Sequence, residues 1–461
     1  MSCPDSRKSI DRVRGLNELC GMEDRQKRKR RRVLERLDLD GVEYIENSAF
    51  GKFELDEGRL PAPGAAPNNV SRSASLFEVF LQILDPTFLL ELREHHHNRN
   101  PACMLRKKSK TVLFTLADIL KFFAIRLHIQ ATQYSHERGT SRDPFPGLYR
   151  TKIRDFFGRP EKFLSEENYS KLLTSFWIPP SMAKGALTSR MNEIVRGGQI
   201  RALDEKMFKW RGASPCIKMV KSKPTPVGHW TSQVCVRLAS SGLPVCVGMF
   251  PFTRCTALGE TVQLSDVVAW AVEQQGNDVK SCYVMDSFYL DNTSHPVLLE
   301  KNVPFIASIK NDRFKPLTER LKEKVTDQGK WYGAYLPRKN EVMVHHFSKD
   351  SNVGRKTVLS NAFKLARSRR QPEYRPPAWL EYKLSFSVCD EFNRALADTT
   401  YPFRRSSWES NFDDLFTSTI FINIANIWKS LDFDARADKT LPYCFNSAAI
   451  NLFAYAVGLE E

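Results

Sequence analysis

Hydrophobic residues between positions 75 and 196 recur at the spacing of α-helices. One series runs from Phe77 to Leu92, and another begins at Thr115 and continues through Ile125. A repeat of three to four residues places apolar side chains on one helical face, which then packs against other helices. Further short series precede Gly197, so we predict that residues 71–197 form an all-helical region.

The spacing of the hydrophobic residues changes after Gly197. Apolar runs of the length of β-strands follow, with two helical segments between them. The predicted strands cover residues 200–208, 229–238, 243–250, 281–285 and 304–309, and the predicted helices cover 261–275 and 291–301. Three strands followed by alternating helices and strands predict an α/β fold, in which one sheet contains mixed strand directions.

A more polar stretch interrupts this pattern. It contains a charged helix at 317–325, strand candidates at 331–335, 341–347 and 357–359, and a basic stretch from Lys364 to Arg375. We interpret residues 313–380 as an insertion that carries an exposed basic loop. Helical spacing returns from Phe386 to Trp428. The sheet core is therefore predicted in two parts, 198–312 and 381–430, and a C-terminal helical segment follows at 431–461.

The first 70 residues are polar and contain a dense basic run from Gln26 to Arg32. Like charges at this density repel one another and resist packing. Such a run is typical of a nuclear-import signal or a DNA-contacting tail, although a merely solvated basic segment has the same composition. The segment Leu60 to Pro67 is rich in proline, which breaks both helices and strands. We therefore predict a disordered basic tail and linker over residues 1–70.

The charge balance favours a polyanionic partner. The 461-residue chain has 69 Lys and Arg against 53 Asp and Glu, a formal net charge of +16. Nucleic acid is favoured over a membrane, because no amphipathic anchor or lipidation signal stands out. A second basic patch, Arg106 to Lys110, could contact phosphates or simply be solvated. No apolar run reaches eighteen residues and no signal sequence begins the chain, so neither a membrane span nor secretion is expected.

The cysteine and histidine patterns argue against a zinc site. Ten cysteines are scattered without a CxxC pair or a finger-like spacing to histidine. Cys235 and Cys246 lie in apolar runs and are interpreted as reduced core residues. The adjacent histidines His95 to His97 would point in different directions from one helix, so we interpret them as a solvated polar run.

Three aspartates are candidates for chemistry. Asp204 lies within the first predicted strand, Asp286 ends the fourth, and Asp390 lies on a later helix. Carboxylates from separate elements can hold two divalent cations that promote phosphoryl transfer. An aspartate at the end of a strand is also a common cap or surface residue, so spacing alone leaves both interpretations open.

Several blocks of the sequence resemble piggyBac-type transposases. The blocks are Leu203-Asp204-Glu205-Lys206-Met207 with Trp210-Arg211-Gly212, Lys223-Pro224 and Gly228; Met285-Asp286-Ser287-Phe288-Tyr289; His346-Phe347-Ser348-Lys349-Asp350; and Cys389-Asp390-Glu391-Phe392-Asn393. They occur in the family's order, and the resemblance covers roughly residues 75 to 430.

The resemblance implies an RNase H-like core with a mixed sheet, a flanking helical region for dimerisation and DNA binding, and an insertion. It also implies cut-and-paste transposition of double-stranded DNA by a protein that can form a homodimer. With the basic run from Gln26 to Arg32, we expect a nuclear location. Carried over by position, Asp204, Asp286 and Asp390 would be catalytic residues that hold two Mg²⁺ ions. They would act as metal ligands, not as general bases.

Two departures from the family pattern raise a second hypothesis. The family usually has another aspartate three residues after the third metal ligand, where this chain has Asn393. A cysteine-rich zinc module often ends the family's chains, whereas only Cys444 follows Cys389 here. The alternative is therefore a domesticated, catalytically inactive DNA-binding or scaffold protein. A third hypothesis, an unrelated basic α/β protein, would be favoured if the three aspartates were far apart in space.

Overall fold

A computed structural model of the chain describes residues 43–46, 53–55, 65–67, 69–99, 105–107, 110–132, 154–158, 162–197, 200–210, 214, 217–221, 226–251, 262–274, 281–309, 314–336, 341–347, 355–365, 377–399 and 408–460. The chain divides into two compact units, residues 1–42 and 43–461, and all described residues belong to the second. No helix in these ranges is long and apolar enough to cross a membrane.

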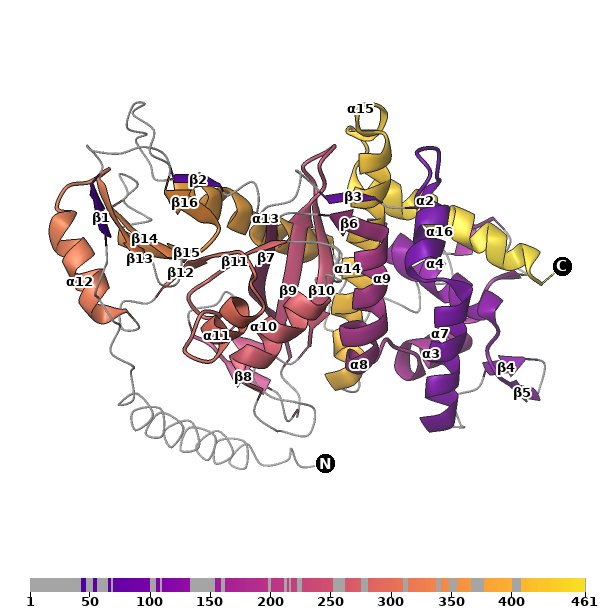
Figure 1. The fold of residues 1–461 in the computed structure, drawn as a ribbon. Coiled ribbons are helices and arrows are strands. Elements are labelled where there is room, and N and C mark those ends of the chain that lie inside the picture. Colours follow the sequence, from indigo (N-terminus) through magenta and orange to yellow (C-terminus); the bar gives the residue numbers. More distant parts are fainter. Residues whose placement is uncertain are drawn as a thin grey trace. The chain divides into compact units, whose positions relative to one another are not determined.

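Ten strands of the described ranges form one mixed sheet (Figure 1), in the order β1-β13-β14-β15-β12-β11-β7-β9-β10, with β8 paired to β9. The strands are β1 (Glu43–Glu46), β7 (Ile200–Lys209), β8 (Ile217–Met219), β9 (Val227–Arg237), β10 (Pro244–Phe250), β11 (Cys282–Met285), β12 (Phe305–Ser308), β13 (Trp331–Leu336), β14 (Glu341–Phe347) and β15 (Arg355–Ser360). The pairs β11–β7 and β11–β12 are parallel, and the other pairs of this sheet are antiparallel. The predicted mixed α/β core is confirmed.

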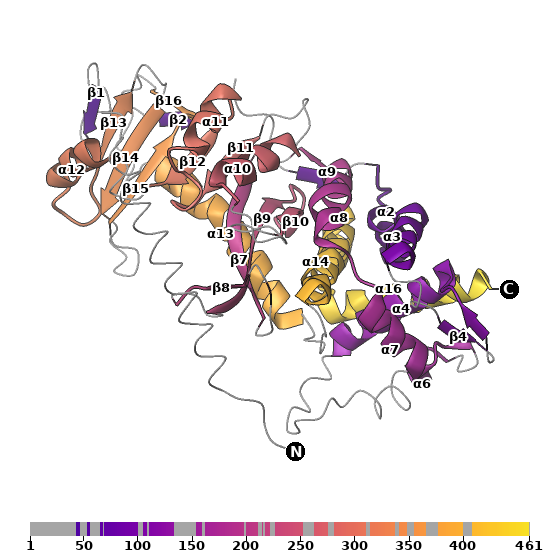
Figure 2. The ribbon, with the colours of Figure 1, turned by 90° about the horizontal axis from the view of Figure 1, so that it is seen from below.

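Three strands of the predicted insertion continue the core sheet. β15 pairs with β12 antiparallel, so that Ile306 lies opposite Ser360, and β14 and β13 follow outward. Helix α12 (Lys315–Lys324) packs against β13 and β14 (Figure 2). Strands β13, β14 and β15 therefore extend the core sheet, while the domain boundaries themselves stay a prediction.

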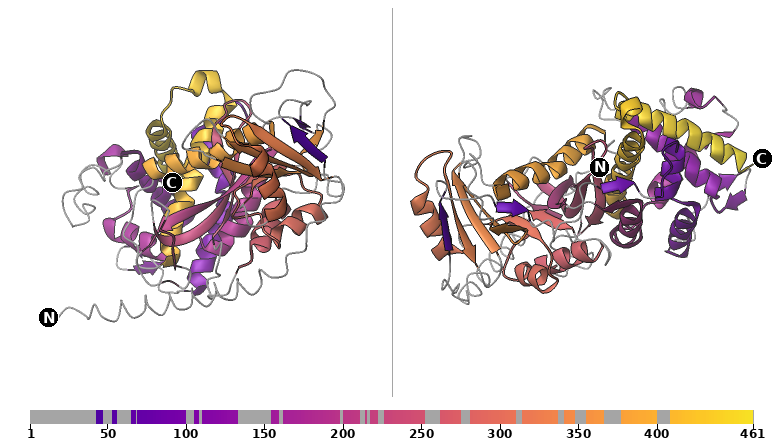
Figure 3. Two further views of the ribbon diagram at one scale, coloured as in Figure 1. Left: turned by 90° about the vertical axis from the view of Figure 1, so that its left-hand side faces the viewer. Right: turned by 45° about the horizontal axis from the view of Figure 1, so that its top comes forward.

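Helices cover both faces of the sheet (Figure 3). Helix α13 (Pro377–Thr399) lies on one face, and α10 (Leu264–Glu273) and α11 (Ser294–Glu300) lie on the other. Strand alternation agrees with this arrangement. Cys282 and Val284 share an apolar cluster with Tyr382 of α13, whereas the intervening Tyr283 donates its phenol hydrogen to Ala271 O of α10 at 2.6 Å.

The predicted helical region is confirmed in its main elements (Figure 1). Its helices are α2 (Leu76–Ile83), α3 (Pro86–Arg99), α4 (Leu116–Thr132), α6 (Arg154–Phe156), α7 (Glu166–Ser175), α8 (Pro180–Met182), the π-helix η4 (Ala183–Leu187) and α9 (Thr188–Ile194). The later helices are α14 (Trp408–Leu431), α15 (Phe433–Arg436) and α16 (Leu441–Gly458), of which α14 packs against α2 and α16 packs against α4. Every residue of α4 from Ala117 to Ala131 is buried, because α3, α7 and α16 pack around it.

Side chains of α14 and α9 protect the outer edge of β10. Asn423 donates from Nδ2 to Cys246 O at 2.7 Å and accepts from Cys246 N at 3.0 Å. Asn426 donates to Pro244 O, and Asn192 donates to Val247 O. A buried edge strand needs such partners, because its outward backbone groups have no neighbouring strand.

Three short strands correct the prediction for residues 1–70. β1 joins the main sheet, β2 (Phe53–Leu55) pairs with β16 (Phe363–Leu365), and β3 (Ala65–Pro67) pairs with β6 (Val195–Gly197). The linker prediction is wrong at residues 65–67, since proline is tolerated at the end of a two-stranded pairing. The basic run from Gln26 to Arg32 lies outside the described residues.

Two further expectations for the helical region are corrected. The region is not entirely helical, because β4 (Leu105–Lys107) and β5 (Lys110–Val112) form a hairpin. The histidine run is not solvated throughout, because His96 is only 3% exposed. Its ring packs against Phe176 and Trp177, and Trp177 N donates to its Nε2 at 3.2 Å. His96 therefore joins α3 to the end of α7.

Candidate functional site

The register of two parallel strands brings Asp204 and Asp286 together. Met285 at the end of β11 pairs with Leu203 of β7, and the next residue of each strand is an aspartate. Side chains alternate between the faces of a sheet, so Asp204 shares a face with Ala202, and Asp286 shares it with Val284. The two carboxylates are therefore neighbours on the face covered by α13.

Asp390 comes to the same face from α13. The helix packs on β7, and the preceding residue, Cys389, lies with its Sγ 3.5 Å from Ala202 O. Electrostatics gives a second indication of proximity. Burial raises the pKa of the Tyr382 phenol, and the charges of all three aspartates raise it further. The structure thus gathers the three predicted residues around one buried phenol on one sheet face.

The three carboxylates differ in their surroundings. Asp204 is 8% exposed, and its Oδ1 accepts from Glu205 N at 2.8 Å. Asp286 is half-buried, and its Oδ1 accepts from Ser287 N at 2.5 Å and from Ser308 Oγ at 2.9 Å. Asp390 is exposed and makes no hydrogen bond or ion pair within the described part of the chain. Two of the carboxylates are held by hydrogen bonds, and the third faces solvent.

The donor set suits a hard divalent cation, since Mg²⁺ prefers carboxylate oxygens. In the described ranges, however, no three His, Cys, Asp or Glu side chains stand in an arrangement that could hold one metal ion as they are. The fold therefore brings the aspartates to one face without closing them into a finished ligand shell.

Sequence reasoning missed three side chains around the aspartates. Lys206 lies two residues after Asp204 on the same strand face, and its Nζ is 3.5 Å from Asn393 O. Ser308 and Tyr382 adjoin Asp286. The two-residue period of β7 could have identified Lys206, but the neighbours from β12 and α13 follow only from tertiary packing.

The other predicted basic segments are only partly described. Arg106 and Lys110 belong to the β4–β5 hairpin, and Lys364 lies in β16. The remainder of the Lys364 to Arg375 stretch lies outside the described residues. Five buried cysteines, among them Cys235 and Cys246, carry free thiols, as predicted for reduced core residues.

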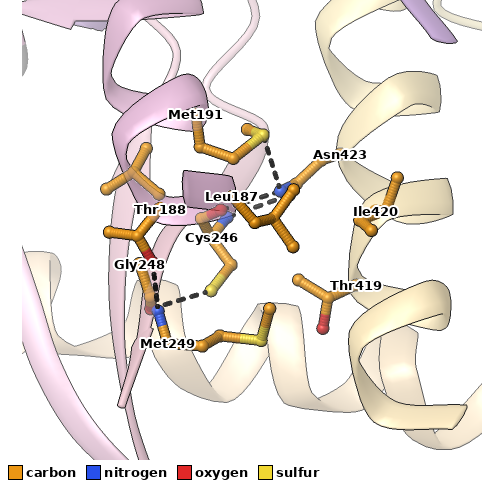
Figure 4. A pocket seen from close by; sticks show the side chains of 10 residues that line it. Leu187, Thr188, Met191, Cys246, Gly248, Met249, Thr419, Ile420 and Asn423 are labelled. Carbon is orange, nitrogen blue, oxygen red and sulfur yellow. Dashed lines mark hydrogen bonds between the residues drawn. The ribbon is translucent and has the colours of Figure 1, made fainter. Parts of the chain in front are cut away.

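A small cavity between β10, α9 and α14 is not a candidate active site (Figure 4). Leu187, Met191, Met249 and Ile420 contribute to its lining, and no carboxylate does. Asn423 is its most polar side chain, and both ends of that amide are engaged with the backbone of Cys246.

Scans against known protein families and against curated proteins give no match. Among solved structures, the chain is similar to a piggyBac transposase determined by electron cryomicroscopy as a synaptic complex with hairpin DNA. The two share 12% sequence identity with a TM-score of 0.65, and the similarity covers 86% of this chain and 84% of that chain. The fold of this protein is therefore the fold of a piggyBac transposase.

Proposed function

We propose that this protein is a piggyBac-type DNA transposase that binds double-stranded DNA and performs metal-dependent strand cleavage and transfer. The observation that carries the proposal is the parallel register of β7 and β11. It brings Asp286 beside Asp204 on the face covered by the helix of Asp390. The similarity of fold supports the same family of reactions.

In this proposal Asp204, Asp286 and Asp390 bind two Mg²⁺ ions as ligands and do not act as general bases. These aspartates would hold the ions, which would supply Lewis-acid activation of a hydroxyl nucleophile and stabilisation of the leaving oxygen. Asp204 and Asp286 offer oxygens from a rigid sheet. Asp390 approaches from the exposed surface of α13, where a DNA backbone has access.

The proposed partner is duplex DNA, contacted through the basic segments at 26–32, 106–110 and 364–375. Six of the seven residues from Gln26 to Arg32 are Lys or Arg. Such runs neutralise phosphates and also serve as nuclear-import signals. We therefore also propose a nuclear location, with homodimers as the assembly that acts on DNA.

The alternative is a domesticated DNA-binding or scaffold protein with an idle core, and two observations favour it. Asn393 retains an oxygen but lacks the negative charge of the family's usual aspartate. The ammonium of Lys206, which follows Asp204 by two residues on β7, lies 3.5 Å from the backbone carbonyl oxygen of Asn393. A fixed positive charge there opposes the approach of divalent cations.

Nicking of a supercoiled plasmid by the purified full-length protein distinguishes the two functions. A transposase should nick DNA only with Mg²⁺ or Mn²⁺, and Asp204→Ala, Asp286→Ala or Asp390→Ala should each abolish nicking. Asp434→Ala is the matched control, because Asp434 is exposed on α15, outside this site. DNA binding without cation-dependent nicking would establish the alternative.

A further inference from the structure

Ser308 is placed to control the orientation of Asp286. It ends β12, is 3% exposed, and donates from Oγ to Asp286 Oδ1 at 2.9 Å. Its oxygen also accepts from Ser287 N at 3.0 Å. A serine hydroxyl has one hydrogen and two lone pairs. The hydrogen is committed to Asp286, and one lone pair remains for another donor.

Tyr382 supplies that donor. Its phenol hydrogen-bonds to Ser308, is 8% exposed, and its ring stacks on Phe386 with centroids 5.3 Å apart and an interplanar angle of 10°. Because the Ser308 hydrogen points to Asp286, the Tyr382 hydroxyl must be the donor in this contact.

The hydrogen bonds on Asp286 are distributed unequally between its two oxygens. Both bonds, from Ser287 N and Ser308 Oγ, end on Oδ1. Oδ2 receives none within the described ranges. A carboxylate held by one oxygen has a fixed plane, and its other oxygen is presented in one direction.

We propose that Tyr382 and Ser308 are positioning residues that hold the Asp286 carboxylate by Oδ1, so that Oδ2 is presented to a divalent cation. This inference rests on the proposed function of the three aspartates. Tyr382 acts only through Ser308, in a chain that runs from α13 through β12 to the end of β11.

Mn²⁺ binding to the purified full-length protein, followed by electron paramagnetic resonance, tests this chain without requiring catalysis. Ser308→Ala should weaken Mn²⁺ binding about ten- to a hundredfold, as is usual when a partner of a metal ligand is removed. Tyr382→Phe deletes one oxygen and keeps the ring, so the fold should persist while binding weakens. The double variant should bind no more weakly than Ser308→Ala alone.

Tyr283→Phe is the matched control, because it also removes one buried phenol hydrogen bond, here to Ala271 O. It should leave Mn²⁺ affinity unchanged. Thermal unfolding of each variant separates loss of fold from loss of positioning.

The outcomes separate the inference from the function on which it rests. If Asp286→Ala loses Mn²⁺ while Ser308→Ala and Tyr382→Phe bind it as wild type does, the positioning role is wrong and the metal site stands. If the effects of the two variants add in full, Tyr382 does not act through Ser308. If the wild-type protein binds no Mn²⁺, both the proposed function and this inference fail.

Discussion

The guanidinium of Arg126 on α4 lies 2.5 Å from a carboxylate oxygen of Asp413 on α14, and neither side chain is more than 1% exposed. Arg126 also donates to Asp414 Oδ1 at 3.1 Å. The second oxygen of Asp413 accepts from Ile178 N at 2.9 Å. One cation thus compensates two buried carboxylates and fastens the helical region to α14.

Replacement of Arg126 by methionine should destabilise the protein by about 3–5 kcal/mol, because it removes the guanidinium that contacts two buried carboxylates. Chemical denaturation of the full chain measures this loss. Lys171→Met is the control, since Lys171 forms an exposed i,i+4 pair with Glu167 that contributes well under about 1 kcal/mol. An equal effect of both substitutions would contradict the structural role given to Arg126.

His229 should make the protein sensitive to acid. It is fully buried on β9, its ring stacks on Phe412, and burial lowers its pKa to about 4. Unfolding restores an ordinary pKa of about 6.5, so between these values the unfolded chain binds the additional proton. The stabilising contribution of neutral His229 is therefore fully present above pH 6.5. Through this residue, the free energy of unfolding should decrease by roughly 3 kcal/mol as the pH falls from 6.5 to 4.

His345 adds to this dependence of the free energy of unfolding on pH, because burial lowers its pKa to about 4 as well. Denaturation curves at several pH values should show a shallower dependence for His229→Phe and for His345→Gln than for wild type, and the shallowest for the double variant. Unchanged slopes in both single variants would mean that neither histidine is neutral in the folded protein.

The basic run from Gln26 to Arg32 should account for much of the salt dependence of DNA binding. Each neutralised phosphate contributes about 0.9 to the slope of log affinity against log salt. Alanine in place of the six Lys and Arg residues should therefore reduce the slope by as much as about 5 if all six contact phosphates. Fluorescence anisotropy with a labelled duplex measures the slope.

Lys171→Ala and Lys315→Ala are controls for this measurement, because each lysine already pairs with a glutamate of its own helix. They should leave the slope close to the wild-type value. Wild-type binding that does not vary with salt would exclude phosphate neutralisation as the source of affinity.

Local periodicity was sufficient to predict the strands that carry Asp204 and Asp286 and the helix that carries Asp390. The same periodicity also indicated that His96 is buried, because it follows Leu92 by four residues on a buried helical face. The polar residues around His96 made this pattern hard to recognise. β3 could not be predicted, because its strand structure comes from pairing with the distant Val195–Gly197. The contact between Ser308 and Asp286 likewise depends on the order of strands, which local pattern does not determine.

The edge of β10 offers a test of how the helical region is joined to the sheet. Asn423 is 1% exposed and satisfies both the N–H and the C=O of Cys246 on the side where β10 has no neighbouring strand. Asn423→Leu keeps a similar volume but leaves two buried backbone groups without partners. At about 1–3 kcal/mol for each group, the expected loss of stability is roughly 2–6 kcal/mol.

Equilibrium unfolding in urea measures that loss, with Asn451→Leu as the control. Asn451 is exposed on α16, so its substitution should change stability by no more than about 0.5 kcal/mol. Hydrogen exchange at the Cys246 amide gives an independent reading, since loss of its acceptor should accelerate exchange there before global unfolding. If Asn423→Leu leaves both the unfolding midpoint and this exchange rate at wild-type values, α14 does not protect the edge through Asn423, and apolar packing alone holds it against β10.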